Sequence, residues 1–308
     1  MFDETLITAV LVGAIAASVP LMLAGIGELI SERAGVLNIG LEGMMLMGAY
    51  GGFWVAIETE SIWLGFIGGA AAGALASLVM VFLCVRWGLD QIVVGIGVLL
   101  GAEGLTSLLD AATFADTRPR IGITARLDIP GLSDIPVAGR VVFGEPYMVY
   151  VTLLAVAVAG WVLWKTPWGL AIRATGERPE AVDAAGVNVV VVRSLAVLSA
   201  GVFGGLGGAY LSLVSAGNFI PMMTGGRGFM AIVLAMLARG RPLLLAAGAL
   251  LFGFATAGTT ALQLVGVEVR PEIVNSLPFA VVLAALVLLG RNEFLPSALA
   301  LPYVRGER

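Results

Sequence analysis

The chain has 308 residues, of which 59% are hydrophobic and 12% are charged, and its mean hydropathy is +1.00. Soluble domains carry about 25% charged residues, so this composition indicates a membrane protein. The net charge of −4 is spread along the chain without a basic stripe, which argues against nucleic acid as a partner. Histidine is absent and Cys84 is the only cysteine, so we expect no disulfide within the chain and no metal site.

We expect a single all-α transmembrane domain over residues 1–308, because a helix needs about 20 apolar residues to cross a bilayer. The apolar stretches predict about nine transmembrane helices, with eight or ten also compatible. They lie near residues 5–27, 37–57, 61–85, 91–112, 147–164, 193–214, 217–238, 242–264 and 273–290. Glycines interrupt the first half of the seventh, so its apolar part, Phe229 to Leu237, is too short to cross alone.

The distribution of Lys and Arg sets the expected orientation. Placing residues 165–193 in the cytoplasm leaves most other basic residues inside, with the acidic N-terminus outside and the basic C-terminus inside. The loop 113–146 is the exception, because it would be external and yet carries four arginines, which four acidic residues offset. Its prolines predict a fixed, hairpin-like cap on the outer face.

Two regions interrupt the hydropathy pattern in corresponding ways, Gly27 to Tyr50 and Ser215 to Leu237. Each follows an apolar helix, contains glycines and an asparagine, and re-enters as a short Met-rich helix. In the expected topology the two run in opposite directions, which is the pattern of an inverted repeat with broken helices. Such breaks tend to line a substrate path, because their freed backbone groups need water or ligand at that depth.

Two candidates for the substrate pathway lie at the first break. Asn38 and Glu42 are four residues apart, which places them on one face of a helix. A carboxylate entering a membrane helix is costly and usually faces a cavity or a partner, so both residues could shape the pathway. Alternatively, Glu42 pairs with Arg33 or caps the end of a broken helix.

Four further candidates are Glu103, Asn218, Arg227 and Phe229. Glu103 lies near the middle of the fourth span. It could contact the ligand in the pathway, or it could form a hydrogen bond with a neighbouring helix. Arg227 lies between glycines at the second break, where it could steer a ligand, dock a soluble receptor or reach the lipid headgroups. Phe229 and Phe219 could stack a planar ligand or simply pack.

Residues 165–193 form a polar connection that is much longer than two helices need. Pro179 suits the first turn of a helix and Gly186 its end, so a short amphipathic helix is expected between them. Its small residues form a smooth face for another protein, and its acids could meet a partner's arginines; a solvated linker helix is the alternative. The candidate docking residues are Glu180, Ala181, Asp183, Ala184 and Gly186.

Residues 180–186 resemble the EAAxxxG coupling loop of ABC importer permeases, with Val182 in place of the second alanine. The stretch GELISERAGVLNIGLEGMMLMGA is similar to permeases of the branched-chain amino acid, ribose and nucleoside importer superfamily, within its nucleoside and simple-sugar branch. The blocks NIGLEG, WGLAIRATGE, TGGRGF and LPYVRGER follow in the expected order over nearly the whole chain. Two departures, Arg239 to Pro242 and Asn275 to Phe279, weaken any transfer of ligand identity.

This resemblance implies the type II ABC importer permease fold in the cytoplasmic membrane of a bacterium or archaeon. It implies a second related permease, in a heterodimer or a homodimer, and an external binding protein, either a lipoprotein or periplasmic. A separate ATP-binding protein would use ATP and Mg and dock on residues 180–186, so this chain would be neither an enzyme nor a cofactor carrier. The expected ligand is a nucleoside, with simple sugars and branched-chain amino acids as alternatives.

An ion-coupled secondary transporter is the rival from another class, and it would need no docking surface on residues 165–193. A membrane enzyme is disfavoured, because the sequence offers no histidine and no paired acids at catalytic spacing.

Overall fold

The computed structural model describes residues 4–115, 119–122, 138–264 and 295–303, with isolated positions at 135 and between 276 and 287. These residues contain helices and no strand. The helices are α1 (Glu4–Arg33), α2 (Leu41–Thr59), α3 (Ile62–Met80), α4 (Gln91–Phe114), α5 (Ala138–Phe143), α6 (Tyr147–Lys165), α7 (Pro167–Glu177), α8 (Pro179–Ala184), α9 (Val189–Tyr210), α10 (Arg227–Leu237) and α11 (Pro242–Leu264). Two π-helices, η1 (Val81–Arg86) and η2 (Leu211–Ser215), extend α3 and α9.

Side chains that accept hydrogen bonds from free N–H groups begin several of these helices. The Asp90 carboxylate accepts from the N–H groups of Ile92 and Val93 at the start of α4. Thr166 caps α7, in which Pro167 takes the first position. These residue types favour helix starts because they satisfy orphan donors, which is why the sequence locates the boundaries well.

Within the described part of the chain, six helices are long and apolar enough to cross a membrane, and they make the chain a multi-pass membrane protein. They are Leu6–Arg33, Ile62–Arg86, Gln91–Phe114, Tyr147–Lys165, Val189–Ser215 and Pro242–Thr259. They correspond to six of the nine predicted spans, and the ninth predicted span, 273–290, lies largely outside the described residues. The remaining two predicted spans are the broken ones.

Both predicted breaks are present in the structure. Residues 34–40 are not helical, and α2 begins only at Leu41. The second break occupies residues 216–226, and the 11 residues of α10 extend about 16 Å, roughly half of a hydrocarbon core. The first break differs from expectation in one respect, because α2 has 19 residues and is not short.

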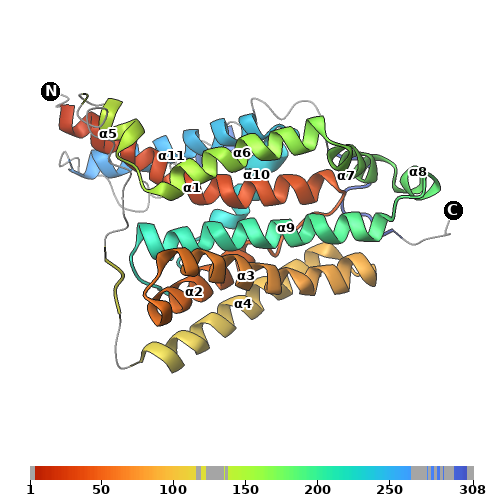
Figure 1. Cartoon of the computed structure of the whole chain (residues 1–308), viewed down its shortest axis with the longest axis horizontal. Coiled ribbons are helices and arrows are strands. Elements are labelled where there is room, and N and C mark those ends of the chain that lie inside the picture. Colours follow the sequence, from red (N-terminus) through yellow and green to blue (C-terminus); the bar gives the residue numbers. More distant parts are fainter. Residues whose placement is uncertain are drawn as a thin grey trace.

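The long helices α1 and α9 lie side by side along the middle of the bundle (Figure 1). Helices α2 and α3 pack on α9, with α4 outside them, and α6, α10 and α11 pack on α1. Of the two long helices, the helix that follows each break packs on the one that does not precede it, α2 on α9 and α10 on α1. An inverted repeat whose halves exchange these helices would produce this arrangement, and the repeat itself stays a prediction.

Glycines allow the helices around α9 to approach closely. A Cβ at Gly208 would overlap the carbonyl oxygen of Met45 on α2, and one at Gly205 would overlap that of Gly69 on α3. The Ser212 hydroxyl donates to the Ala49 carbonyl across the same contact, at 2.8 Å. Small residues and interhelical hydrogen bonds of this kind hold helices together in lipid, where the hydrophobic effect does not.

The two ends of the bundle differ. Helices α7 and α8 project from one end, and residues 295–303 lie against that same end (Figure 1). Helix α1 begins at the opposite end, beside α5 (Figure 1). Of the predicted loop 113–146, the structure describes residues 113–115, 119–122, 135 and 138–146, which include α5. The Ile121 N–H donates to the Gly217 carbonyl at 2.8 Å. Part of this loop therefore contacts the second break.

Candidate functional site

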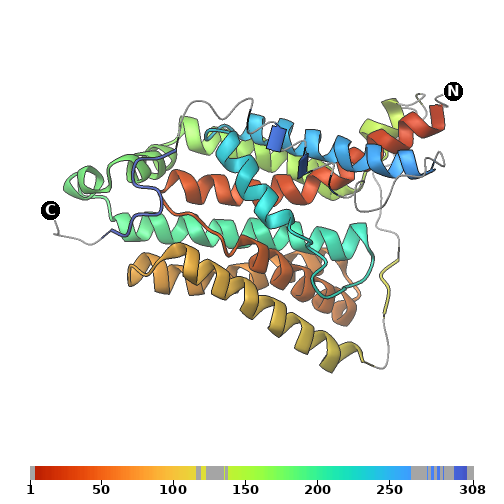
Figure 2. The same ribbon diagram turned by 180° about the vertical axis from the view of Figure 1, so that it is seen from behind.

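The two broken helices meet inside the bundle, where α10 crosses near the start of α2 (Figure 2). The joining side chain is Glu42, in the first turn of α2, which is 4% exposed. Its Oε1 accepts from the Gly226 N–H at 2.8 Å, and its Oε2 accepts from the Gly228 N–H at 2.5 Å. Glu42 thus caps the N-terminus of α10, where free N–H groups and the helix dipole stabilise a negative charge.

The glycines of TGGRG make this cap possible. Gly225 and Gly226 have φ of +55° and +82°, which side chains rarely adopt. A Cβ at Gly228 would lie 2.6 Å from the Cα and the Oε2 of Glu42, so only glycine admits the carboxylate. Glu42 therefore caps the end of a broken helix, as one of the two alternatives predicted. The capped helix is α10, which follows the second break, and not the helix that carries Glu42.

Asn38 lies before the first turn of α2, so it does not share a helical face with Glu42 as the spacing suggested. It is fully buried, its N–H donates to Glu28 Oε1 at 3.1 Å, and its Nδ2 donates to Met44 Sδ at 3.2 Å. The reason is local: residues 34–40 leave the helical conformation, so helical spacing does not apply to them.

Side chains from neighbouring helices satisfy the buried backbone of the first break. Besides the Asn38–Glu28 bond, the Leu37 N–H donates to Gln91 Oε1 at 2.8 Å, and Ser31 donates to the Val36 carbonyl at 2.9 Å. Irregular backbone at this depth needs such partners. Sequence analysis missed the buried acids Glu28 and Glu32 on α1, although their spacing of four residues at the end of a span was a usable signal.

The other pathway candidates are distributed around this junction. Arg227, in the first turn of α10, is half-buried, and its guanidinium donates to the carbonyls of Met223 and Thr224 at 3.2 and 3.0 Å. Phe229 follows on α10 and is 37% exposed. The structure thus brings Glu42 and Arg227 together at the two helix starts, with Phe229 at the edge of the junction.

Asn218 and Glu103 make no hydrogen bond to Glu42 among the described residues. Asn218 is half-buried within the second break, and the adjacent Phe219 packs edge-on against Tyr50, with ring centroids 5.3 Å apart. Phe219 is therefore part of the core, whereas Phe229 is exposed. Glu103 is half-buried on α4, and its backbone carbonyl accepts from the Thr106 hydroxyl at 3.4 Å.

The candidate docking surface has the predicted geometry. Helix α8 begins at Pro179 and ends before Gly186, whose φ is +85°. The Gly186 N–H donates to the Asp183 carbonyl at 2.9 Å, and the Val187 N–H donates to the Val182 carbonyl at 3.1 Å. Such bonds close a helix through a glycine in the left-handed region. The exposed residues are Glu180, Ala181, Ala184 and Gly186, and Asp183 is half-buried.

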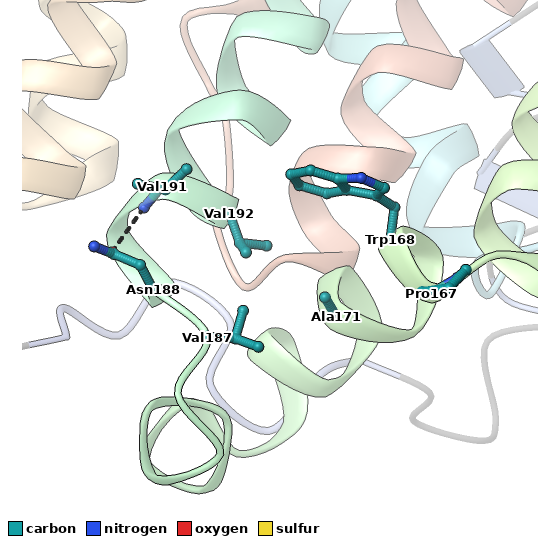
Figure 3. Close-up of a pocket in the computed structure, with 7 residues that line it drawn as sticks. All are labelled: Pro167, Trp168, Ala171, Val187, Asn188, Val191 and Val192. Carbon is teal, nitrogen blue, oxygen red and sulfur yellow. Dashed lines mark hydrogen bonds between the residues drawn. The ribbon is translucent and has the colours of Figure 1, made fainter.

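An apolar pocket of about 330 Å³ lies beside this surface, between α7 and the start of α9. Figure 3 shows side chains from both helices around it, with the ring of Trp168 on one side and Val187 and Val191 on the others. Asn188 stands at its rim and caps α9, since its Oδ1 accepts from the Val191 N–H at 3.2 Å. Trp168 is 56% exposed, so α7, α8 and the pocket form one open surface at this end.

The six long apolar helices of the described residues, the two breaks that meet inside the bundle and the projecting helix α8 are features of a membrane permease. The chain belongs to the family of the branched-chain amino acid transport system permease component, whose model matches residues 10–288. No solved structure shows a significant match to the chain.

Several curated relatives match over most of their length. The Haloferax volcanii protein TsgC13, named provisionally as a glucose ABC transporter permease protein, is 40% identical over 88% of this chain and 82% of its own. The guanosine ABC transporter permease protein NupQ of Bacillus subtilis is 34% identical over 94% of both chains. The nucleoside ABC transporter permease protein NupC of Lactococcus lactis is 31% identical over 94% of this chain and 95% of its own.

Each of these organisms has a second permease protein that also matches this chain. They are TsgB13 at 30% identity, NupP at 28% and NupB at 23%.

Proposed function

We propose that this chain is the membrane subunit of an ATP-driven importer and that it translocates a nucleoside across the cytoplasmic membrane. The observation that carries the proposal is its similarity to NupQ and NupC, whose names state guanosine and nucleoside transport and which it matches over nearly their whole length. The two helix breaks inside the bundle add support, because broken helices accompany substrate paths in transporters.

The electrostatics of the junction fit an uncharged polar ligand. N–H groups at the start of α10 stabilise the Glu42 carboxylate, and Nη1 of the oppositely charged Arg227 donates to two carbonyls. A pathway past this junction, with Asn38, Glu103, Asn218 and Phe229 as its other candidates, would present polar groups with little net charge. Nucleosides and sugars match that environment better than the charged ends of an amino acid.

We assign α8 as the coupling helix, with its end of the bundle in the cytoplasm and the start of α1 outside. An ATP-binding protein would dock on Glu180, Ala181, Asp183, Ala184 and Gly186 and would supply the ATP and Mg chemistry, so this chain needs no cofactor. The paired permease names in each related organism support a heterodimer with a second permease. An external binding protein, lipid-anchored or periplasmic, would deliver the ligand.

The ligand is tested by uptake of labelled uridine in cells with and without this gene, with unlabelled guanosine, glucose or leucine as competitors. Loss of uptake on deletion and competition by guanosine alone supports the nucleoside. Competition by glucose favours the second candidate, a simple sugar, which the 40% identity to TsgC13 supports. Uptake that is unchanged by deletion contradicts the nucleoside assignment.

The coupling assignment is tested by two variants. Gly186→Leu strains a glycine with φ of +85°, and Ala184→Trp adds bulk to the exposed face of α8 without backbone strain. Both should leave the protein in the membrane and abolish uptake. Ala112→Trp is the matched control for added bulk, because Ala112 is an exposed alanine in the last turn of α4, outside α8. Normal uptake by both α8 variants would exclude α8 as the coupling helix.

A further inference from the structure

Arg193, in the second turn of α9, has an unusual environment. Its side chain is nearly enclosed, with 3% of the residue exposed. The guanidinium donates to three backbone carbonyls, those of Ala34 at 3.2 Å, Leu301 at 2.8 Å and Ala298 at 3.4 Å. A buried cation is costly unless its donors are satisfied, and here the rigid fork of arginine joins two segments that are far apart in the sequence.

Residues 295–303 are bound at the same place to α7 and to the first break. The Ala298 N–H donates to the Gly176 carbonyl at 2.9 Å, and the Ala300 N–H donates to the Gly35 carbonyl at 3.2 Å. The Ser297 hydroxyl donates to Glu177 Oε2 at 2.9 Å. We call the contact between residues 295–303, Arg193, the end of α7 and residues 34–35 the C-terminal clasp.

Two glycines, Gly35 and Gly176, allow the segments of this clasp to approach closely. Gly35 has φ of +88°, and a Cβ there would lie 2.9 Å from Nη2 of Arg193 and 3.1 Å from the Ala298 carbonyl oxygen. A Cβ at Gly176 would overlap the carbonyl oxygen of Arg33. The segments therefore pack backbone against backbone, and such a contact transmits displacement because closely packed groups cannot be compressed.

The clasp lies between the docking helix and the pathway. On one side, α7 continues into α8 after the single residue Arg178. On the other side, residues 34–40 lead directly into α2, whose first turn carries Glu42. A displacement of α8 that moves α7 must therefore move residues 34–35 or break the hydrogen bonds of the clasp.

We infer that Arg193 is a positioning residue for transport, which fixes residues 295–303 as the link that carries movement of α8 to the first helix break. This inference rests on the proposed importer function. Residues 295–303 include Leu301, Pro302 and Tyr303, the first three residues of the LPYVRGER block, and Arg193 donates to the carbonyl of Leu301. Among the described residues, the hydrogen bonds of Arg193 go to backbone carbonyls and to no candidate pathway residue, and Glu180 of α8 interacts with its guanidinium electrostatically. Arg193 therefore acts on the pathway through the segments that it joins.

The test uses the complete importer in proteoliposomes with labelled uridine or glucose, whichever the wild type takes up. Ligand uptake and ATP hydrolysis are measured on the same preparation. Arg193→Met should lower the number of ligands imported per ATP hydrolysed about tenfold or more, while ATP hydrolysis continues. Arg193→Lys should restore this ratio only in part. Its ammonium can donate to a carbonyl of the clasp, but it cannot reach all three carbonyls as the guanidinium does.

Arg86→Met is the matched control, since Arg86 is an exposed arginine at the end of η1. It should leave the ratio of uptake to hydrolysis unchanged. The ratio separates the clasp from a merely structural role, because a loss of folded protein lowers uptake and hydrolysis together. An unchanged ratio in Arg193→Met would overturn the inference.

A second variant covers the case in which Arg193→Met fails to fold. Glu177→Cys and Ser297→Cys, combined with Cys84→Ser, allow α7 and residues 295–303 to be cross-linked and then released by reduction. If the clasp moves as one unit, the cross-linked importer should transport as well as the reduced one. A cross-link that stops uptake reversibly would show that the two must separate, and would refute the clasp.

Failure of the importer assignment is visible separately. Wild-type proteoliposomes without ATP-dependent uptake of either probe would overturn that assignment together with this inference. An active wild type whose ratio is insensitive to Arg193→Met would overturn the inference alone.

Discussion

The capping of α10 by Glu42 predicts a large effect of a small substitution. Glu42→Gln keeps the size of the side chain but replaces one carboxylate oxygen with an NH₂ group. One of the two N–H donors, that of Gly226 or Gly228, then faces another donor, and the remaining bond loses its charge. Hydrogen bonds to charged groups contribute about 1.5–3 kcal/mol and neutral ones about 1 kcal/mol, so the expected loss of stability is about 2–4 kcal/mol.

This loss should appear as a fall in the thermal midpoint of the purified protein in detergent. For a chain of this size 1 kcal/mol corresponds to roughly 2 °C, so a decrease of about 4–8 °C is expected. Glu103→Gln on α4 is the control, because the Glu103 carboxylate makes no hydrogen bond among the residues that the structure describes. The control should change the midpoint by less than about 1 °C.

The reasoning is refuted if Glu42→Gln melts like the wild type, because the two hydrogen bonds at 2.8 and 2.5 Å would then contribute nothing. An equal decrease in Glu42→Gln and Glu103→Gln would also refute it, since the effect would then follow from removing any membrane carboxylate. Glu42→Ala, which removes both bonds, should melt lower than Glu42→Gln.

Two further predictions concern packing. Gly208→Ala should lower the stability by about 1–3 kcal/mol, because its Cβ would overlap the Met45 carbonyl oxygen; Gly97→Ala, with nothing within 4 Å, should be neutral or slightly stabilising in the same thermal assay, and equal midpoints would contradict the close approach. Cys84 is 3% exposed, so N-ethylmaleimide should label the folded protein at least about tenfold more slowly than the unfolded protein, as followed by mass spectrometry; fast labelling of the folded protein would contradict its burial.

Much of the fold was predictable because it depends on local signals. Six long apolar helices follow from stretches that are long enough to cross a membrane. The ends of α8 follow from Pro179 and Gly186, which have the first-turn and left-handed conformations that their positions require. The breaks before α2 and α10 also follow from local composition, since glycine-rich, polar stretches do not continue a membrane helix.

The candidate site was predictable only in part. The sequence identifies Glu42 as a costly carboxylate that needs a partner, but the partner itself, the N-terminus of α10, is 184 and 186 residues away. The spacing of Asn38 and Glu42 suggested a shared face, which the non-helical residues 34–40 prevent.

The sequence by itself therefore determined the class of protein, the long helices, the two breaks and the ends of α8. Only the tertiary structure decided that α2 packs on α9 while α10 packs on α1. It alone also decided that Glu42 caps α10 and that Arg193 holds residues 295–303 against the first break. The physical reason is the range of the interactions. Hydropathy, turn chemistry and capping act over a few residues, whereas the partner of a buried charge is set by which distant backbone groups the packed bundle leaves unsatisfied.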